Sequence, residues 1–120
     1  MKDDGRPLFL RIAGQIENSI VDGSLAADTQ VPSTNELAAF HRINPATAAK
    51  GINQLVADGI LYKRRGIGMF VATDARAQLL ERRRRDFARQ FVAPLMAEAG
   101  KLGMDAEEIK KLIDVWEPQR

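Results

Sequence analysis

The segment 32–71, PSTNELAAFHRINPATAAKGINQLVADGILYKRRGIGMFV, carries the signals that decide the fold of this chain. Ser33 followed by Glu36 is the pattern of a capping box and predicts a helix that begins after Ser33. Asn44-Pro45 should end that helix, because the residue before a proline avoids the α conformation. The same pair suits the start of a second helix, since asparagine is a good N-cap and proline fits the first helical position. So short a turn predicts two helices that cross steeply, as in a helix-turn-helix motif.

Three predicted helices carry apolar residues at spacings of three and four, the pattern of an amphipathic helix. One begins near Pro7 and ends near Gly23, and the other two form the helix-turn-helix, whose second helix stops near Gly59. The apolar positions are Phe9, Ile12, Ile16 and Ile20; Leu37, Ala38 and Phe40; and Ala48, Ile52, Leu55 and Val56. We expect the stripe of the first helix to pack against the other two and form one core.

The residues after Gly59 predict a β-hairpin. Ile60–Arg64 and Met69–Val71 have the composition of strands, and Arg65–Gly68 supplies the glycines of the turn between them. A Gly-x-Gly pair also occurs in phosphate-binding loops, but this one leads into a strand rather than a helix, so we interpret it as the turn. A basic hairpin after a helix-turn-helix is the wing of a winged helix.

Small or polar side chains occupy the face of the second motif helix that the core leaves free, among them Ala46, Thr47 and Lys50. A DNA major groove admits an α-helix whose N-terminal residues reach the base edges, and small side chains allow close approach. Lys50 by itself is an ordinary solvated lysine. Beside this face and a basic wing, contact with a DNA phosphate becomes the favoured interpretation.

Positive charge is concentrated in the same part of the chain. The 120 residues carry a net charge of +2, with 45% hydrophobic and 28% charged residues, which is ordinary for one globular domain plus an appendage. Residues 1–36 carry three basic and six acidic side chains, a net charge of −3. Residues 37–73 carry five basic side chains and one acid, Asp58, a net charge of +4. This distribution favours a nucleic-acid partner.

Several classes of protein are disfavoured. The sequence has no cysteine and a single histidine, His41, so we expect no metal site and no cofactor. It also lacks a nucleophile–base pair or a carboxylate–histidine cluster, which argues against an enzyme. No apolar run is long enough to span a membrane, and the start MKDDGRPLFL lacks the apolar core of a signal peptide. We therefore expect a cytoplasmic protein with no membrane partner.

These motifs together resemble the GntR family of bacterial transcription regulators. The matching residues are Pro32-Ser33, Glu36-Leu37-Ala38, Asn44-Pro45-Ala46-Thr47, Lys50, Leu55, Gly59 and Gly66-Ile67-Gly68-Met69-Phe70-Val71. The short C-terminal part is similar to that of the YtrA-type branch. The sequence departs from the family pattern at Asn35, His41, Arg42 and Ala48, where the family usually has Arg, Leu, Gly and Val.

The resemblance implies a set of residues that contact DNA. They are Ser33, Thr34, Asn35, Asn44, Pro45, Ala46, Thr47, Lys50, Arg64, Arg65 and Gly66. Asn35 stands where the family usually has an arginine that reads guanine. An asparagine cannot repeat that contact, but it can pair bidentately with adenine, so the base preference is expected to differ.

The character of the sequence changes near Thr73–Asp74, which divides the chain into a winged helix-turn-helix over residues 6–74 and a helical segment over 75–117. Residues 75–102 predict a helix that Pro94 should kink or interrupt. Asp105 with Glu108 is a second capping box, and the helix after it should end before Pro118. The fold class is thus mostly α: three helices and a hairpin wing, then a short two-helix segment.

The apolar stripes of this C-terminal segment need a partner, because two helices of about 45 residues cannot bury both stripes alone. A homodimer is the simplest solution and would match a palindromic operator. The predicted interface residues are Phe87, Phe91, Leu95, Ile109, Leu112, Ile113 and Trp116. The family resemblance also allows a small-molecule effector in this segment, lined by Met96, Met104 and Trp116.

Two functions stay open for a winged helix of this kind, a sequence-specific DNA-binding regulator and a module for protein–protein assembly. The basic wing and the polar helix face favour the first, a dimeric repressor of GntR type. Arg82–Arg85 either contact DNA flanking the operator or, more ordinarily for arginines that point all around a helix, stay solvated beside Glu81 and Asp86.

Overall fold

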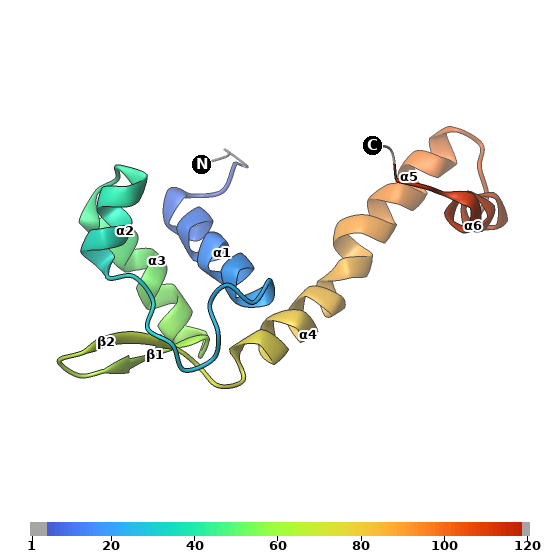
Figure 1. Ribbon diagram of the computed structural model, residues 1–120. Helices are drawn as coiled ribbons and strands as arrows, with labels where there is room; N and C mark the ends of the chain where they lie inside the picture. Colours follow the sequence, from blue (N-terminus) through green and yellow to red (C-terminus); the bar gives the residue numbers. More distant parts are fainter. Residues whose placement is uncertain (1–4, 119–120) are drawn as a thin grey trace. The chain divides into compact units, whose positions relative to one another are not determined.

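The computed structural model describes residues 5–118 (Figure 1), and its elements follow one another in the predicted order. They are α1 (Leu8–Val21), α2 (Thr34–His41), α3 (Pro45–Ala57), β1 (Leu61–Arg64), β2 (Gly68–Val71), α4 (Ala75–Phe87), a π-helix η1 (Ala88–Val92), α5 (Ala93–Lys101) and α6 (Ala106–Val115). The chain forms two compact units, one up to Glu81 and one from Arg82 onward. The fold is mostly helical with one two-stranded hairpin, as the sequence predicts.

Both helices of the helix-turn-helix begin where the sequence predicts. The Ser33 hydroxyl accepts a hydrogen bond from the Glu36 N–H at 3.1 Å, and the Glu36 carboxylate accepts one from the Ser33 N–H at 3.1 Å. This reciprocal pair confirms the capping box. Asn44 caps α3 by accepting from the Ala46 N–H at 2.7 Å, and Pro45 occupies the first helical position. Local side-chain chemistry therefore fixes where α2 and α3 begin.

The first unit is built on one apolar core that joins α1, α2, α3 and the hairpin. Its buried members are Ala13, Ile16, Ile20, Val31, Leu37, Ala38, Ala48, Ile52, Leu55, Ile60, Leu61, Val71, Ala75 and Leu79. The expected packing of the first stripe against Leu37, Ile52 and Leu55 is confirmed. Phe40, which the spacing places on the apolar side of α2, does not join this core: its side chain is 82% exposed, and α2 buries only Leu37 and Ala38.

The hairpin gains a third backbone partner that precedes the helix-turn-helix in sequence. β1 and β2 pair antiparallel from Leu61 opposite Val71 to Arg64 opposite Gly68. On the other side of β2, the Asp28 N–H donates to the Val71 carbonyl at 2.8 Å, and the Val31 N–H donates to the Met69 carbonyl at 2.9 Å. The connector after α1 therefore holds the wing against the core.

The first core also includes the beginning of α4. Ala75 and Leu79 are both 0% exposed and belong to the core cluster of the first unit. The structural division after Glu81 thus lies later than the compositional change near Thr73–Asp74. Sequence composition did not reveal it, because the two buried residues are separated by the polar residues of an otherwise exposed, arginine-rich helix.

The second unit is a run of helices with very little buried surface. The helix changes from α to π geometry at Ala88–Val92, directly before Pro94, which confirms the predicted interruption. Asp105 and Glu108 form the predicted capping box of α6. That helix ends at Val115, so Trp116 lies one residue beyond it in an extended conformation and not within the helical stripe. None of the helices in residues 5–118 is long and apolar enough to cross a membrane.

Candidate nucleic-acid interface

The N-terminal end of α3 presents small and polar groups to solvent. Asn44, Pro45 and Ala46 are exposed, and Thr47 is half-buried where α3 begins to contact the core. The Asn44 side chain accepts the Ala46 N–H, and the Asn44 carbonyl accepts those of Thr47 and Ala48, so this end of the helix is capped. The positive end of the helix dipole lies at this exposed surface. Such a surface can approach a groove or a phosphate closely.

Lys50, one turn further along α3, is held by an aromatic ring from α1. Its Nζ atom lies 4.2 Å from the centroid of the Phe9 ring, a cation–π distance. We expected Phe9 to be an ordinary core residue, but it is half-buried and supports this lysine. The sequence predicts that α1 packs against α3 but not that Lys50 contacts Phe9, because the two residues are 41 positions apart.

The start of α2 carries the remaining helical candidates. Ser33 is committed to the capping box, Thr34 is half-buried, and Asn35 is exposed. The Asn35 side chain makes no hydrogen bond within the described residues 5–118, so both its carbonyl oxygen and its amino group are available. An amide with both groups available is what a bidentate contact to adenine requires.

The wing ends in exposed basic residues on a supported hairpin. Arg65 and Gly66 lie in the exposed turn, and Gly66 has φ +78°, a left-handed conformation that glycine adopts without steric cost. The Arg64 guanidinium lies 4.9 Å from the centroid of the Phe70 ring. Phe70 in turn stacks on Tyr62 at 5.8 Å across the strand pair. The wing therefore offers its arginines from a rigid base.

The sequence did not predict a polar cluster that lies at the base of the wing. The Tyr62 hydroxyl donates to the Asp28 carboxylate at 3.0 Å, and the Thr73 hydroxyl contacts the same carboxylate at 3.0 and 3.1 Å. Partial burial and the neighbouring carboxylate raise the pKa of Tyr62, so it stays a neutral donor. Asp28 has φ +63°, a left-handed conformation that aspartate adopts more readily than most residues, and no pattern in the sequence points to this role.

Gln30 also fixes the wing, from the connector that precedes α2. Its side-chain amide donates to the Ile67 carbonyl at 3.0 Å, which ties the hairpin turn to the connector. Arg42, in the turn of the helix-turn-helix, has φ +55° at the position where the resembling family usually has glycine. The backbone keeps the left-handed turn in spite of the side chain.

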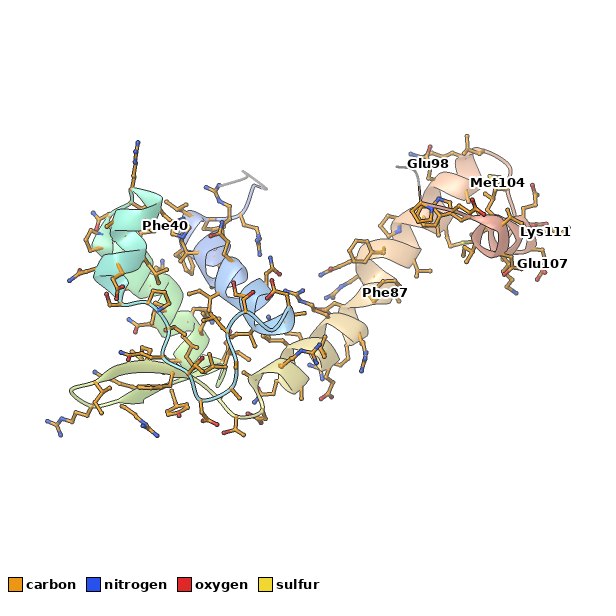
Figure 2. All side chains as sticks on the ribbon, in the orientation of Figure 1. Phe40, Phe87, Glu98, Met104, Glu107 and Lys111 are labelled. Carbon is orange, nitrogen blue, oxygen red and sulfur yellow. The ribbon has the colours of Figure 1, made fainter. Side chains whose placement is uncertain are left out.

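The second set of predicted residues lies on the second unit. Six of the seven are exposed large apolar side chains: Phe87, Phe91, Leu95, Leu112, Ile113 and Trp116. Phe87 and Phe91 contact each other with ring centroids 5.4 Å apart (Figure 2 labels Phe87). Ile109 differs, because it is only 7% exposed within the single chain. The single chain already covers most of this side chain, so Ile109 offers little surface to a partner.

The described residues contain no cluster of three or more His, Cys, Asp or Glu side chains that could hold a metal ion. The exposed surface of the first unit instead combines the capped N-terminal end of α3, Lys50 and a basic wing. Within residues 37–73, Asp58 is the single acid against five basic side chains. These are the chemical features of a surface that binds the backbone and groove edges of duplex DNA.

Comparison with known proteins agrees with this geometry. The family profile "Bacterial regulatory proteins, gntR family" matches residues 8–71. The HTH-type transcriptional repressor YtrA of Bacillus subtilis (strain 168) is 27% identical over 107 residues, which cover 89% of this chain and 68% of the relative. A crystal structure of a transcriptional regulator from Oenococcus oeni has a TM-score of 0.80 at 29% identity, covering 95% of this chain and 93% of that one.

A further solved structure holds DNA. AraR(DBD) in complex with operator ORX1 has a TM-score of 0.55 at 30% identity, covering 60% of this chain and 87% of that chain. The matched family and these relatives are transcription regulators and not enzymes. The chain is accordingly a DNA-binding transcription regulator, and it belongs to the gntR family of bacterial regulatory proteins.

Proposed function

We propose that the protein is a homodimeric repressor that binds a palindromic operator with two winged helix-turn-helix units and releases it when a small metabolite binds. The main support for the dimer is the amount of apolar surface that stays exposed on α5, α6 and the residues beside them. The observation that carries operator binding is the set of exposed polar and basic groups on α2, α3 and the wing.

In this proposal the N-terminal end of α3 enters the major groove. Ala46 is small enough for close approach, and Thr47 and Asn44 offer hydrogen-bonding groups to base edges or phosphates. Lys50 and the wing residues Arg64 and Arg65 neutralise phosphates. The Phe9 ring under Lys50 supports this role, because it limits the positions that the lysine samples before DNA arrives.

The small amount of buried surface in the second unit supports the proposed dimer. Among its described residues only Ala99 and Ile109 are buried, so its helices gain little from burial within one chain. Phe87, Phe91 and Trp116 are instead 55%, 61% and 70% exposed. A second copy brings an identical apolar face, and a two-fold interface is self-complementary. Two-fold symmetry then presents two reading units to a palindrome.

Repression and release by a metabolite extend the proposal to regulation. YtrA, the similar protein from Bacillus subtilis, is a transcriptional repressor, which supports repression rather than activation by this protein. A repressor needs a signal that lowers its affinity for DNA, and a small molecule that binds the free state better supplies one. As a chromosomal regulator in a bacterium, the protein would act in the cytoplasm.

The dimer is tested by sedimentation of the whole chain at several concentrations. We expect a dimer for the unaltered protein and a shift toward monomer for Phe91→Ala combined with Trp116→Ala, because two large apolar anchors are removed. Phe40→Ala is the matched control, since it removes a phenylalanine of the first unit that is even more exposed than Phe91. A chain truncated after Glu81 should be monomeric. If this truncated chain still sediments as a dimer, the interface lies in the winged helix.

Operator binding is tested by selecting sites from random duplexes and then measuring affinity against salt. With three phosphate contacts per protomer, a dimer should lose about a thousandfold in affinity between 50 and 200 mM salt. Lys50→Ala, and Arg64→Ala with Arg65→Ala, should weaken binding to every sequence, whereas Lys110→Ala on α6 should not. A selected site without two-fold symmetry, or binding indifferent to salt, would contradict the proposal.

A further inference from the structure

A groove between α1 and α2 in the first unit has no assigned role. Its cavity volume is about 500 Å³, within the range of roughly 300–1,000 Å³ typical of small-molecule sites. Its wall combines apolar side chains, among them Ile16, Leu37 and Phe40, with the polar groups of Gln15, Glu36 and His41. The pocket is therefore large enough for a metabolite and carries both apolar and polar partners.

Phe40 supplies an aromatic wall that the protein leaves uncovered. It is 82% exposed on α2 (Figure 2) and contacts the His41 ring edge-on, with centroids 4.9 Å apart. A phenylalanine so exposed beside a concave apolar surface gains most from a ligand that covers it. The two neighbouring rings favour a ligand with a flat apolar body.

Glu36 sets the charge of the ligand. One of its carboxylate oxygens accepts the Ser33 N–H, and the other accepts no hydrogen bond from the described part of the chain. The hydrogen bond from the Ser33 N–H, with the Ser33 hydroxyl beside it, lowers the pKa of Glu36, so the carboxylate is ionised at neutral pH. Among the described residues, no lysine or arginine lines the groove. An anionic ligand would meet an uncompensated carboxylate, whereas a cation would find an oxygen available.

We propose that the groove between α1 and α2 binds a small organic cation with a flat apolar body, and that this ligand is the metabolite that releases DNA. The apolar body covers Phe40 and Leu37, and the cationic group pairs with the free oxygen of Glu36. The regulatory half of this proposal rests on the proposed function, whereas the binding half stands on the groove alone.

The same carboxylate connects the groove to the DNA-binding surface. Glu36 closes the capping box with Ser33, and Thr34 and Asn35 lie in the helical turn between those two residues. A cation that draws the carboxylate toward the groove competes with the hydrogen bond from the Ser33 N–H. The first turn of α2, where Asn35 is proposed to read a base, then loses part of its support. Binding of the ligand therefore lowers the affinity for DNA, and binding of DNA lowers the affinity for the ligand.

The binding test uses the whole chain and three matched probes: tryptamine as the cation, 3-ethylindole as the neutral compound and indole-3-propionate as the anion. Backbone amide shifts in NMR report the site and the affinity. We expect tryptamine to bind tightest and to shift amides of α1 and α2. Glu36→Gln should weaken tryptamine about tenfold, to the level of 3-ethylindole, because the charge-assisted pair is lost.

Variants separate binding from folding. Glutamine also serves in a capping box, so Glu36→Gln keeps the helix start. Ser19→Leu fills the groove from α1 and should abolish all probe shifts, whereas Glu98→Gln, a carboxylate outside the groove, should change nothing. Equal binding of all three probes, no shifts at all, or the same affinity in Glu36→Gln would overturn the cation site. Concentration-dependent shifts at the groove without any probe would assign it to a second copy instead.

The regulatory test adds a selected operator duplex. Saturating tryptamine should weaken operator binding about fivefold or more in the unaltered protein and not in Ser19→Leu. If tryptamine binds the groove and operator affinity stays the same, the regulatory half is overturned. A protein that binds no operator even without tryptamine refutes the proposed function and leaves the result on the groove intact.

Discussion

Gly51 allows the tight contact between α1 and α3, and adding one methyl group there tests the described packing. Gly51 is buried on α3, and a Cβ atom at this position would lie 2.8 Å from the Phe9 carbonyl oxygen and 3.5 Å from the Ile12 side chain. A Cβ atom does not approach a backbone oxygen so closely, so Gly51→Ala must push the two helices apart.

The expected magnitude follows from two opposing terms. Overpacking a core typically costs about 1–3 kcal/mol of stability, and the neighbour here is backbone, which relaxes poorly. The change also gains up to about 1 kcal/mol, because alanine favours a helix more than glycine does. We therefore expect a net loss of about 1–2 kcal/mol in the free energy of unfolding of the first unit.

Gly100 on α5 provides the matched control, since an added Cβ there meets nothing within 4 Å. Gly100→Ala should be neutral or stabilising by up to about 1 kcal/mol, through helix propensity alone. Hydrogen exchange of the α1 and α3 amides measures the local free energy in the whole chain. Gly51→Ala should also weaken operator binding, because it moves Phe9 relative to Lys50. If Gly51→Ala is as stable as Gly100→Ala, the described approach of α1 to α3 is incorrect.

Three further predictions follow from single side chains. Asn35→Arg should move the operator position facing that residue from adenine toward guanine in site selection, and a preference for guanine already present in the unaltered protein would refute the reasoning. The lowered pKa of Glu36 predicts stability that is fully present above pH 4.5, the ordinary value, and is lost as the pH falls through the lowered pKa. Acid titration of stability should show this loss in the unaltered chain and not in Glu36→Gln. Tyr62→Phe should cost about 0.5–2 kcal/mol and raise the mobility of the wing, because the Asp28 carboxylate loses a hydrogen-bond donor; hydrogen exchange of the hairpin amides would measure it.

Much of the fold was predictable because its signals are local. The capping boxes at Ser33 and Asp105 and the Asn44-Pro45 pair act within three or four residues, so a sequence displays them directly. The hairpin was predictable for the same reason, since its turn glycines lie between two short segments with the composition of strands. The resemblance to the GntR family then supplied the DNA-binding function, which geometry alone does not specify.

Tertiary structure decided the features that depend on residues far apart in the chain. Phe9 supports Lys50, and Asp28 joins Tyr62 to Thr73, because the core brings these segments together. It also decided which apolar residues are buried: Phe40 is exposed, whereas Ile109 is covered within the single chain. Periodicity gives the apolar positions of a helix, but burial depends on which neighbours the fold places against each of them. The sequence by itself therefore determined the elements and their ends, and only long-range packing determined the support of the wing and the groove between α1 and α2.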